Sequence, residues 1–197
     1  MTNKKFKIFG IDYSVNSPGV TYIDNNKKFE LKNLNIIIFN KDKTRNIWQY
    51  KNLTRYFIKP TYENNIIKFD YMTDLIVNNI SDEDVVAMEG YSFGSTGRAL
   101  TSIHESTGLL KWKIWKRDIL FNVFAPKLIK KFASGSGNAN KPRMLEAAND
   151  FFGTDLMEYY NIKHNDVVIY DIVDSIWICK YMYEEVKNNK FIEKYNF

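Results

Sequence analysis

Residues Lys5 to Asp12 read Lys-Phe-Lys-Ile-Phe-Gly-Ile-Asp, an apolar run of strand-forming residues that ends in an acid. This pattern predicts a central strand of a sheet. Residues Asp84 to Glu89 read Asp-Val-Val-Ala-Met-Glu and repeat the pattern. Two predicted strands therefore deliver the carboxylates of Asp12 and Glu89 to the rim of a sheet.

The rest of the chain predicts an α/β fold, with a mixed central sheet of about five strands flanked by helices. Turn-forming residues Ser14 to Gly19 separate the first strand from two more, which continue an antiparallel meander. The further predicted strands are Val20 to Ile23, Leu34 to Phe39 and Asp118 to Ala125, and the predicted helices are Tyr71 to Asn79, Leu100 to Ile114, Pro142 to Phe152 and Asn165 to Asn188. A basic loop is expected from Lys127 to Lys141. We expect a single domain over 1–197, with an insertion at about 41–69 whose structure the sequence does not indicate.

The amino-acid composition limits which reactive groups an active site of this protein can use. Twenty-eight Lys and Arg against 23 Asp and Glu give a net charge of +5, which permits a nucleic-acid partner without requiring one. Cys179 is the single cysteine and there are two histidines, so an internal disulfide, a cysteine zinc site and clustered-histidine chemistry are not expected. No signal peptide or membrane span is expected, which favours an intracellular, cytoplasmic protein. Carboxylates are left as the reactive groups.

Asp171 and Asp174 lie three residues apart on a predicted helix, so their side chains emerge on one face. Like charges in that arrangement repel by about 0.2–0.5 kcal/mol when exposed. A cation between them would explain the pair, and a solvated helix face is the alternative. Together with Asp12 and Glu89 they form an oxygen-only donor set that suits Mg²⁺ or Mn²⁺. Two such ions, about 3.5–4 Å apart, could hydrolyse a phosphodiester without a His or Cys nucleophile.

Three segments carry a resemblance to a known family: Phe-Gly-Ile-Asp12-Tyr-Ser, Val-Ala-Met-Glu89-Gly-Tyr and Asp171-Ile-Val-Asp174-Ser-Ile. In this order they resemble the motifs of RuvC-type Holliday junction resolvases, which belong to the RNase H-like superfamily. The likeness is greatest to the phage and viral type. Gly-Asn-Ala-Asn-Lys141 resembles the segment that precedes the fourth motif in phage relatives.

The resemblance implies an RNase H-like fold and a homodimer that nicks four-way DNA junctions symmetrically with two divalent ions. It assigns Asp12, Glu89, Asp171 and Asp174 as metal ligands. Lys141 matches a lysine near the scissile phosphate, for which an ordinary solvated lysine is the alternative. In bacterial members an aromatic residue after the glutamate contacts bases at the crossover. Tyr91 and Phe93 bracket that place here, and Ser92 occupies it.

Basic residues flank these motifs, and contact with DNA phosphates is their expected role, with a solvated loop as the alternative. They are Arg98, Lys127, Lys130, Lys131 and Arg143, beside Lys141. The predicted helix from Leu100 to Ile114 has an apolar stripe that suits either a dimer seam or packing on its own sheet. Trp112 and Trp115 on this helix are expected to be packing residues.

Other functions stay open at the level of sequence. The chain could be a different RNase H-like nuclease that cuts RNA–DNA hybrids or other branched DNA. Gly-Ile-Asp-Tyr-Ser also resembles the first phosphate loop of actin-like ATPases, but a second phosphate loop and a second domain are missing. A catalytically silent junction-binding protein is disfavoured by the four acids. If the protein is of phage or viral type, the host cytoplasm is its expected location.

Overall fold

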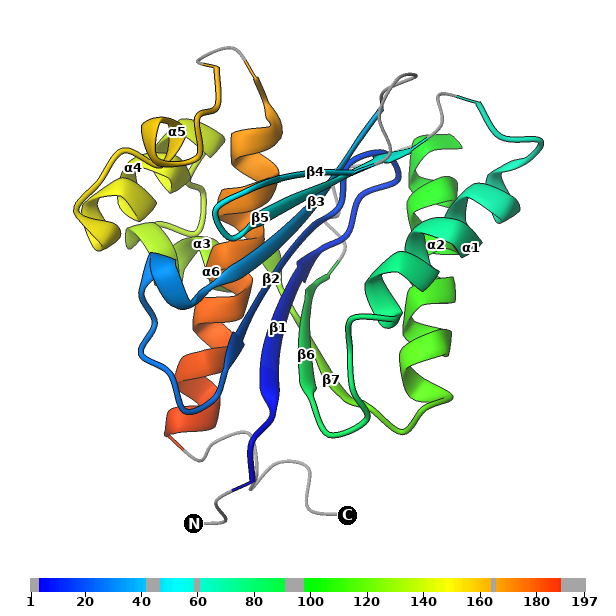
Figure 1. Cartoon of the computed structure of the whole chain (residues 1–197), viewed down its shortest axis with the longest axis horizontal. Helices are drawn as coiled ribbons and strands as arrows, with labels where there is room; N and C mark the ends of the chain where they lie inside the picture. Colours follow the sequence, from blue (N-terminus) through cyan, green and yellow to red (C-terminus); the bar gives the residue numbers. More distant parts are fainter. Residues whose placement is uncertain (1–3, 42–46, 59–60, 91–97, 164–165, 189–197) are drawn as a thin grey trace.

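The computed structural model describes residues 4–41, 47–58, 61–90, 98–163 and 166–188. Within them, seven strands form one mixed sheet in the order β4-β5-β3-β2-β1-β6-β7 (Figure 1). The strands are β1 (Lys7–Asp12), β2 (Gly19–Asp24), β3 (Asn35–Lys41), β4 (Ile47–Tyr50), β5 (Leu53–Ile58), β6 (Val85–Glu89) and β7 (Leu120–Phe124). β1 pairs antiparallel with β2 and parallel with β6, which makes it an interior strand of the sheet.

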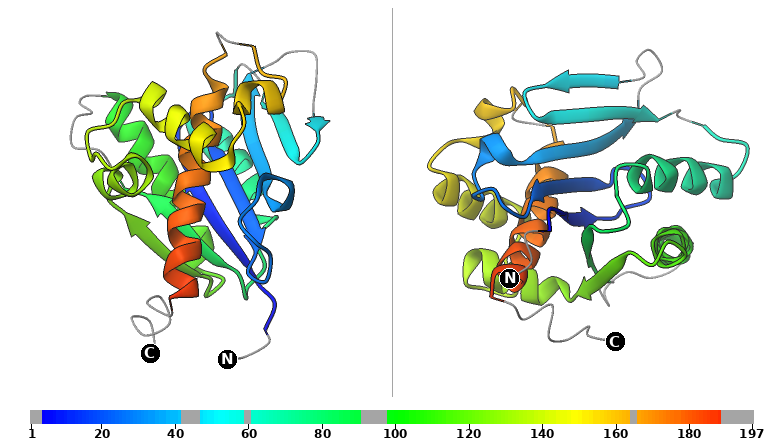
Figure 2. Two further views of the ribbon diagram at one scale, coloured as in Figure 1. Left: turned by 90° about the vertical axis from the view of Figure 1, so that its left-hand side faces the viewer. Right: turned by 60° about the horizontal axis from the view of Figure 1, so that its bottom comes forward.

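Helices cover both faces of this sheet. One layer holds α1 and α2, and the other holds α3 to α6, with α6 running across the sheet beside β1 (Figure 2). Their bounds are α1 (Asn65–Val77), α2 (Arg98–Trp115), α3 (Pro126–Ser134), α4 (Lys141–Phe152), α5 (Leu156–Tyr159) and α6 (Val168–Lys187), and a 3-10 turn, η1, spans Leu31–Asn33. In the described part of the chain, no helix is long and apolar enough to cross a membrane.

Alternation along β1 sends its side chains into two separate cores. Ile8 packs in the core beneath α6, whereas Phe9 and Ile11 pack in the core beneath α1 and α2, and all three are fully buried. Since successive side chains of a strand point to opposite faces, Gly10 and Asp12 share the α6 face with Ile8. The prediction of a central strand from this apolar run is therefore confirmed. Its terminal acid, Asp12, lies on the face that α6 covers.

Two glycines let α6 lie directly on the sheet. A Cβ atom at Gly10 would come within 2.1 Å of the Cys179 backbone nitrogen, and one at Gly19 within 2.2 Å of the Asp171 carbonyl oxygen. Only a residue without a side chain permits such an approach. Between these two points, the Thr21 and Ser175 hydroxyls form a fully buried hydrogen bond of 2.8 Å. The position of α6 on β1 and β2 is thus set by three contacts, at Gly10, at Gly19 and at the Thr21–Ser175 hydrogen bond.

The predicted fold class is confirmed, but the sheet has seven described strands where about five were expected. The additional strands lie in the segment predicted as an insertion at about 41–69. There β5 pairs parallel with β3, and β4 pairs antiparallel with β5, so this segment extends the edge of the sheet. In β4, Trp48 and Tyr50 stack on each other, and Ile47 and Gln49 alternate with them on the exposed side. An exposed isoleucine beside half-buried aromatic residues gives no clear apolar and polar alternation, so the strand was missed.

The prediction of a loop from Lys127 to Lys141 is wrong over the first half of the segment, which belongs to the helix α3. Pro126 begins this helix at a position where a missing N–H is harmless, and Gly135 ends it in the left-handed conformation. Ile129 is buried and anchors the helix against the core. The spacing of Leu128, Ile129 and Phe132 was the available signal for this helix, since apolar residues three and four apart lie on one helix face.

The helix predicted at Tyr71 to Asn79 begins earlier, at Asn65, because Asn64 caps its N-terminus by accepting a hydrogen bond from the Ile67 amide. The two helices predicted near Pro142 to Phe152 and Asn165 to Asn188 are confirmed as α4 and α6. The short helix α5 was not predicted.

The predicted helix from Leu100 to Ile114 is confirmed as α2, but its apolar stripe serves mainly its own domain. Leu110 and Ile114 are fully buried in the core beneath the sheet. The expectation that Trp112 and Trp115 are packing residues is wrong, since their exposed fractions are 50% and 66%. They lie on the outer side of α2, away from the buried stripe.

The close approach of α6 predicts a sharp difference between two Gly→Ala substitutions. Gly19→Ala places a methyl group against the Asp171 carbonyl and should lower the free energy of unfolding by roughly 1–3 kcal/mol. Gly108→Ala, in an open helical position of α2, should raise it by up to about 1 kcal/mol. Urea unfolding of both variants measures the difference, and a Gly19→Ala protein as stable as wild type would contradict the packing described.

Candidate active site

Strand pairing places the first two predicted acids next to each other. In the parallel pair of β1 and β6, Ile11 lies opposite Met88, and the next residue on each strand is Asp12 and Glu89. Neighbouring strands lie about 4.8 Å apart. Alternation turns both carboxylates toward the face that α6 covers, where Ala87 and Ile8 are already buried. The rim of the sheet therefore presents two carboxylates side by side.

The α6 helix adds the other two acids from above. Gly19, whose missing side chain admits the Asp171 carbonyl, is the direct partner of Asp12 in the β1–β2 ladder. Asp171 is 9% exposed, and Asp174 follows on the same side of the helix, partly buried. Asp12, Glu89, Asp171 and Asp174 are called the acidic cluster below.

The pKa shifts confirm that these four carboxylates interact. Burial raises the pKa of Asp12 well above its usual value, and the charges of Asp174, Glu89 and Asp171 raise it further. Burial and the charge of Asp174 raise the pKa of Glu89 to about 7, and burial is the main cause that raises the pKa of Asp174 to about 6. The charges of the other three acids thus make ionisation of Asp12 costlier.

Asp171 differs from the other three because a hydroxyl stabilises its charged form. Burial raises its pKa, while a hydrogen bond donated by Ser17 lowers it. Ser17 lies in the loop between β1 and β2, where its backbone amide donates to the Ser14 hydroxyl at 2.9 Å. The loop after Asp12 therefore positions an acid of α6.

Two lysines offset the negative charge of the acidic cluster. Lys141 lowers the pKa of all four acids, and Lys130 lowers that of Glu89 and Asp174. Lys141 is the first residue of α4. Asn140 caps the N-terminus of this helix, because its side-chain oxygen accepts a hydrogen bond from the Arg143 amide. Its ammonium lies 5.5 Å from the centre of the Tyr170 ring, one residue before Asp171. The Asn140 cap and the Tyr170 ring together hold the Lys141 ammonium beside the acids.

The donor set of the acidic cluster fits a divalent ion such as Mg²⁺, which binds carboxylate oxygens and retains water. The raised pKa values reflect burial and mutual repulsion, and a cation would relieve both. Across the described residues, however, no three His, Cys, Asp or Glu side chains already form a group that could hold a metal. Side-chain rotation, a common response to binding, would be needed to close the coordination shell.

The other predicted DNA-binding residues are distributed differently. Tyr91, Phe93 and the side chain of Arg98 lie outside the described residues. Lys127 and Lys131 are exposed on α3, on the same helix as Lys130. Arg143 is not brought to the acids, because its guanidinium donates to Glu146 at 2.6 Å and faces a separate cavity.

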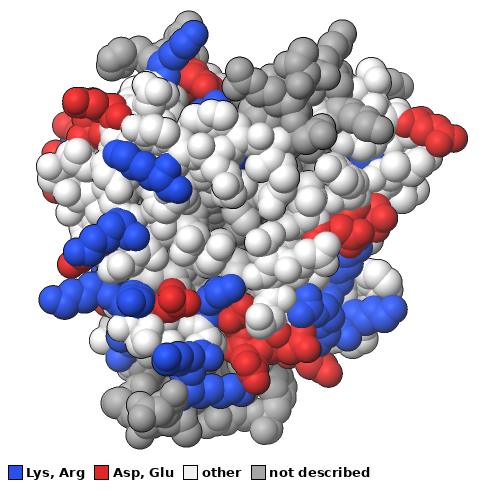
Figure 3. All heavy atoms as spheres, viewed as in Figure 1, with Lys and Arg blue, Asp and Glu red and all other residues white. Residues whose placement is uncertain are grey.

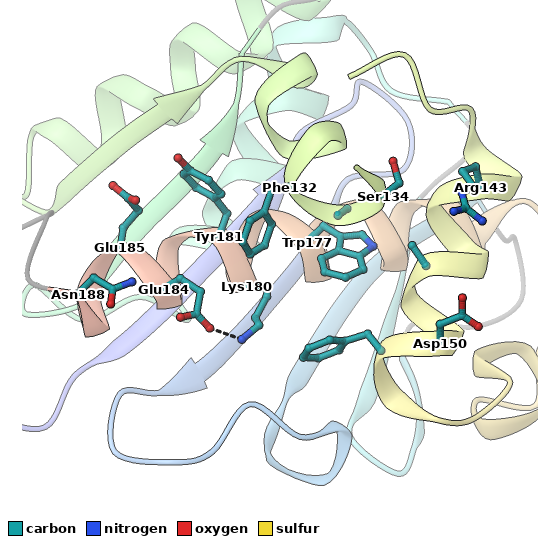
Figure 4. Close-up of a pocket in the computed structure, with 13 residues that line it drawn as sticks. Phe132, Ser134, Arg143, Asp150, Trp177, Lys180, Tyr181, Glu184, Glu185 and Asn188 are labelled. Carbon is teal, nitrogen blue, oxygen red and sulfur yellow. Dashed lines mark hydrogen bonds and ion pairs between the residues drawn. The ribbon is translucent and has the colours of Figure 1, made fainter. Parts of the chain in front are cut away.

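That cavity, of about 850 Å³, lies between α3, α4 and α6 (Figure 4). Phe132, Phe151, Trp177 and Tyr181 are among its lining residues, and Lys180 pairs with Glu184 within it. None of its lining residues belongs to the acidic cluster. This cavity and the predicted chemistry are therefore at different places.

Sequence reasoning missed four residues that shape the site. Gly10 and Gly19 admit α6, Ser17 stabilises the Asp171 carboxylate, and Tyr170 lies beneath Lys141. A glycine inside an otherwise apolar strand was the available signal for Gly10, since such glycines mark close backbone approach. Nothing in the local sequence singles out Ser17 or Tyr170.

Comparison with known proteins identifies the fold. No family model and no curated protein matches the sequence. Among solved structures, the chain is similar to Thermus thermophilus RuvC with 11% identity and a TM-score of 0.57, covering 93% of this chain and 97% of that one. It is also similar to T. thermophilus RuvC in complex with a Holliday junction substrate, with 9% identity and a TM-score of 0.56, covering 92% of this chain and 96% of that one.

The layered mixed sheet with its helices defines an RNase H-like fold. More particularly, the fold is that of the RuvC-type Holliday junction resolvases, as the resemblance of the sequence motifs implied.

The electrostatics of the acidic cluster predict that one charge-removing substitution stabilises the metal-free protein. Since the folded-state pKa values lie above the usual values near 4, the folded protein binds more protons between about pH 4 and pH 7 and loses stability as pH rises through that range. Asp12→Asn should therefore raise the melting temperature in EDTA at pH 7.5 by about 3 °C or more.

At pH 4 the same comparison should give little difference, because the wild-type acids are then largely protonated. Asp24→Asn, at an exposed acid on the far end of β2, serves as the control and should leave the melting temperature unchanged. A lower melting temperature for Asp12→Asn at pH 7.5 would show that the acids do not repel one another in the folded protein.

Proposed function

We propose that this protein is a divalent-metal-dependent endonuclease that resolves four-way or other branched DNA junctions by phosphodiester hydrolysis. The observation that carries the proposal is the meeting of four carboxylates from β1, β6 and α6 on one face of a RuvC-type sheet. The complex of T. thermophilus RuvC with a Holliday junction substrate supports branched DNA as the substrate. Such an enzyme acts on DNA inside the cell, in the cytoplasm.

In this proposal Asp12, Glu89, Asp171 and Asp174 hold Mg²⁺ or Mn²⁺, with two ions at each site. Bound ions of this kind lower the pKa of water and neutralise charge that develops on phosphate oxygens. Asp12 has the central position, since all three other acids affect its pKa. The hydrogen bond from the Ser17 hydroxyl favours the charged form of Asp171 against the effect of burial and would orient its carboxylate.

Lys141 is the proposed cation at the scissile phosphate. It affects all four acids, yet its side chain is exposed, so a phosphate bound at the acidic cluster can contact its ammonium. Lys130 lies on the other helix that borders the acids and contributes a second positive charge. Both would stabilise negative charge in the transition state.

A DNA-binding surface extends from the site over the α3 to α6 layer. Lys127, Lys130 and Lys131 belong to α3. On the face in Figure 3, Lys and Arg side chains lie on both flanks, with Asp and Glu side chains among them. We also assign Arg98, the first residue of α2, and Arg143 of α4 a role in phosphate contact. Tyr91 and Phe93, which follow Glu89, are proposed to contact bases.

The proposed active form is a homodimer. A four-way junction offers two equivalent strands, and a two-fold dimer presents one acidic cluster to each of them. The apolar stripe of α2 is largely used within the domain, so the outer side of this helix is the better candidate for the interface. Trp112 and Trp115 expose large aromatic surfaces there. Aromatic residues are enriched at protein interfaces.

The first test is cleavage of a labelled synthetic four-way junction with Mg²⁺ or Mn²⁺, beside linear duplex and RNA–DNA hybrid. Wild type should nick opposing strands of the junction, whereas Ca²⁺ should support binding with little turnover. Asp12→Asn, Glu89→Gln and Asp174→Asn should each lose activity and retain or improve junction binding, because repulsion of phosphate falls. Substantial cutting by Asp12→Asn and Asp174→Asn, or full activity in EDTA, would refute the proposed site.

A second test separates the role of Lys141 from that of an ordinary DNA-binding lysine. Lys141→Ala should lower the single-turnover cleavage rate by about a hundredfold, because a cation beside the scissile group acts on transition-state charge. Junction affinity should fall only slightly, as one contact among many is lost. Lys131→Ala, exposed on α3, is the matched control and should reduce affinity and leave the rate on bound DNA unchanged. Equal losses of rate and affinity for Lys141→Ala would make it a binding residue only.

A further inference from the structure

The hairpin formed by β4 and β5 contacts the part of the chain that leads into α6. Lys51, in the turn of this hairpin, donates a hydrogen bond of 2.8 Å to the carbonyl of Tyr159, the last residue of α5, and its ammonium lies 3.6 Å from the centre of the Tyr159 ring. Arg55, on β5, pairs with Asp166, which lies two residues before α6 begins. The segment predicted as an insertion therefore reaches the start of the helix that carries two of the four acids.

Asp166 joins Arg55 to α6 through its two carboxylate oxygens. Its Oδ2 atom lies 3.5 Å from the Arg55 Nη1 atom, and its Oδ1 atom accepts a hydrogen bond of 3.1 Å from the Val168 amide. Val168 is the first residue of α6, and the first amides of a helix have no acceptor within the helix itself. Burial raises the pKa of Asp171, in the first turn of α6, and the charge of Asp166 raises it further. The Arg55–Asp166 ion pair thus lies beside the acidic cluster.

Two features hold the Arg55 side chain in place. Arg55 is the cross-strand partner of Trp48, and its guanidinium carbon lies 5.3 Å from the centre of the Trp48 ring, within the range of a cation–π contact. The Trp48 ring is in turn stacked on Tyr50. In the ion pair, the side chains of Arg55 and Asp166 are 15% and 31% exposed, so salt screens their attraction less than that of a surface pair. The β4–β5 hairpin therefore presents a fixed cation to Asp166.

We propose that Arg55 is a positioning residue of the active site, which acts through Asp166 on the first turn of α6 and so on the orientation of the Asp171 carboxylate. This inference rests on the proposed nuclease function. Helix ends fray, and a contact at Asp166 limits fraying on the N-terminal side of Asp171, whereas Gly19 fixes the backbone at Asp171 itself. The guanidinium also offsets the charge of Asp166, which would otherwise add to the repulsion among the acids.

The test is a double-mutant cycle on Arg55 and Asp166, measured by the single-turnover cleavage rate of a four-way junction at saturating protein with Mg²⁺. Arg55→Gln should lower this rate about tenfold, because a misplaced catalytic group slows the chemical step. Arg55→Lys keeps the charge and should retain most of the rate. Asp166→Ala should cost about as much as Arg55→Gln, and the double variant should be no slower than the slower single variant, because both act through one contact.

Two controls separate positioning from DNA contact and from loss of stability. Junction affinity of Arg55→Gln in EDTA, and its dependence on salt, should stay within about twofold of wild type, since no phosphate contact is lost. Lys113→Gln removes a matched cation, 13% exposed, that pairs with Asp70 and Asp74 and joins α1 to α2 on the other face of the sheet. It should lower the melting temperature and leave the rate on bound junction unchanged.

Circular dichroism shows whether each variant is folded at the assay temperature. If Arg55→Gln does not fold, Asp166→Asn decides, because it keeps an oxygen for the Val168 amide and removes the charge that Arg55 pairs with. A wild-type rate for folded Arg55→Gln or for Asp166→Asn, or additive losses in the double variant with a weaker salt dependence of binding, would overturn the positioning role while the proposed function stands. A wild-type protein that neither binds nor cuts branched DNA would overturn the proposed function and this role with it.

Discussion

The contact between α6 and the two strands beneath it is the constraint on which the site depends. Gly10 and Gly19 remove the side chains that would separate helix from sheet, and the buried Thr21–Ser175 hydrogen bond lies between these contacts. The Ser175 hydroxyl also donates to the Ile172 carbonyl within α6, so a slip of the helix would leave the buried Thr21 hydroxyl without this partner. Because Gly19 is the ladder partner of Asp12, the same contact that seats the helix also sets Asp171 above Asp12.

The consequence of this packing is electrostatic. Four carboxylates are held near one another in a partly buried place, which raises their pKa values and makes the folded state less stable at neutral pH than an uncharged site would be. Proteins keep such arrangements where function requires them. Lys130 and Lys141, supplied by α3 and α4, offset part of the repulsion.

The parts of the fold that sequence predicted are those whose pattern is local. An apolar run that ends in an acid indicated β1 and β6, and Pro142 with a periodic stripe indicated α4. The strand patterns predicted that Asp12 and Glu89 reach the rim of the sheet, but the register of β1 on β6 that sets them side by side depends on long-range pairing, which the local pattern does not contain. The β4–β5 strands were missed because their pairing with β3 is also long-range. The helix α3 was missed although Leu128, Ile129 and Phe132 have helical spacing, because the stretch was interpreted by its lysines and by the Ser-Gly-Ser-Gly residues that follow. The exposure of Trp112 and Trp115 could not be judged without the position of α2 on the sheet.

The central claim is that α6 and the sheet together form one divalent-cation site from Asp12, Glu89, Asp171 and Asp174. Anomalous diffraction from crystals soaked in Mn²⁺ tests it most directly, because it locates each ion without any assay of cleavage. The account predicts strong manganese peaks within coordination distance of Asp12 and at least two of the other three acids, and their loss in crystals of Asp12→Asn. Manganese bound only elsewhere, for example near Glu184 and Glu185 at the large cavity, would contradict it.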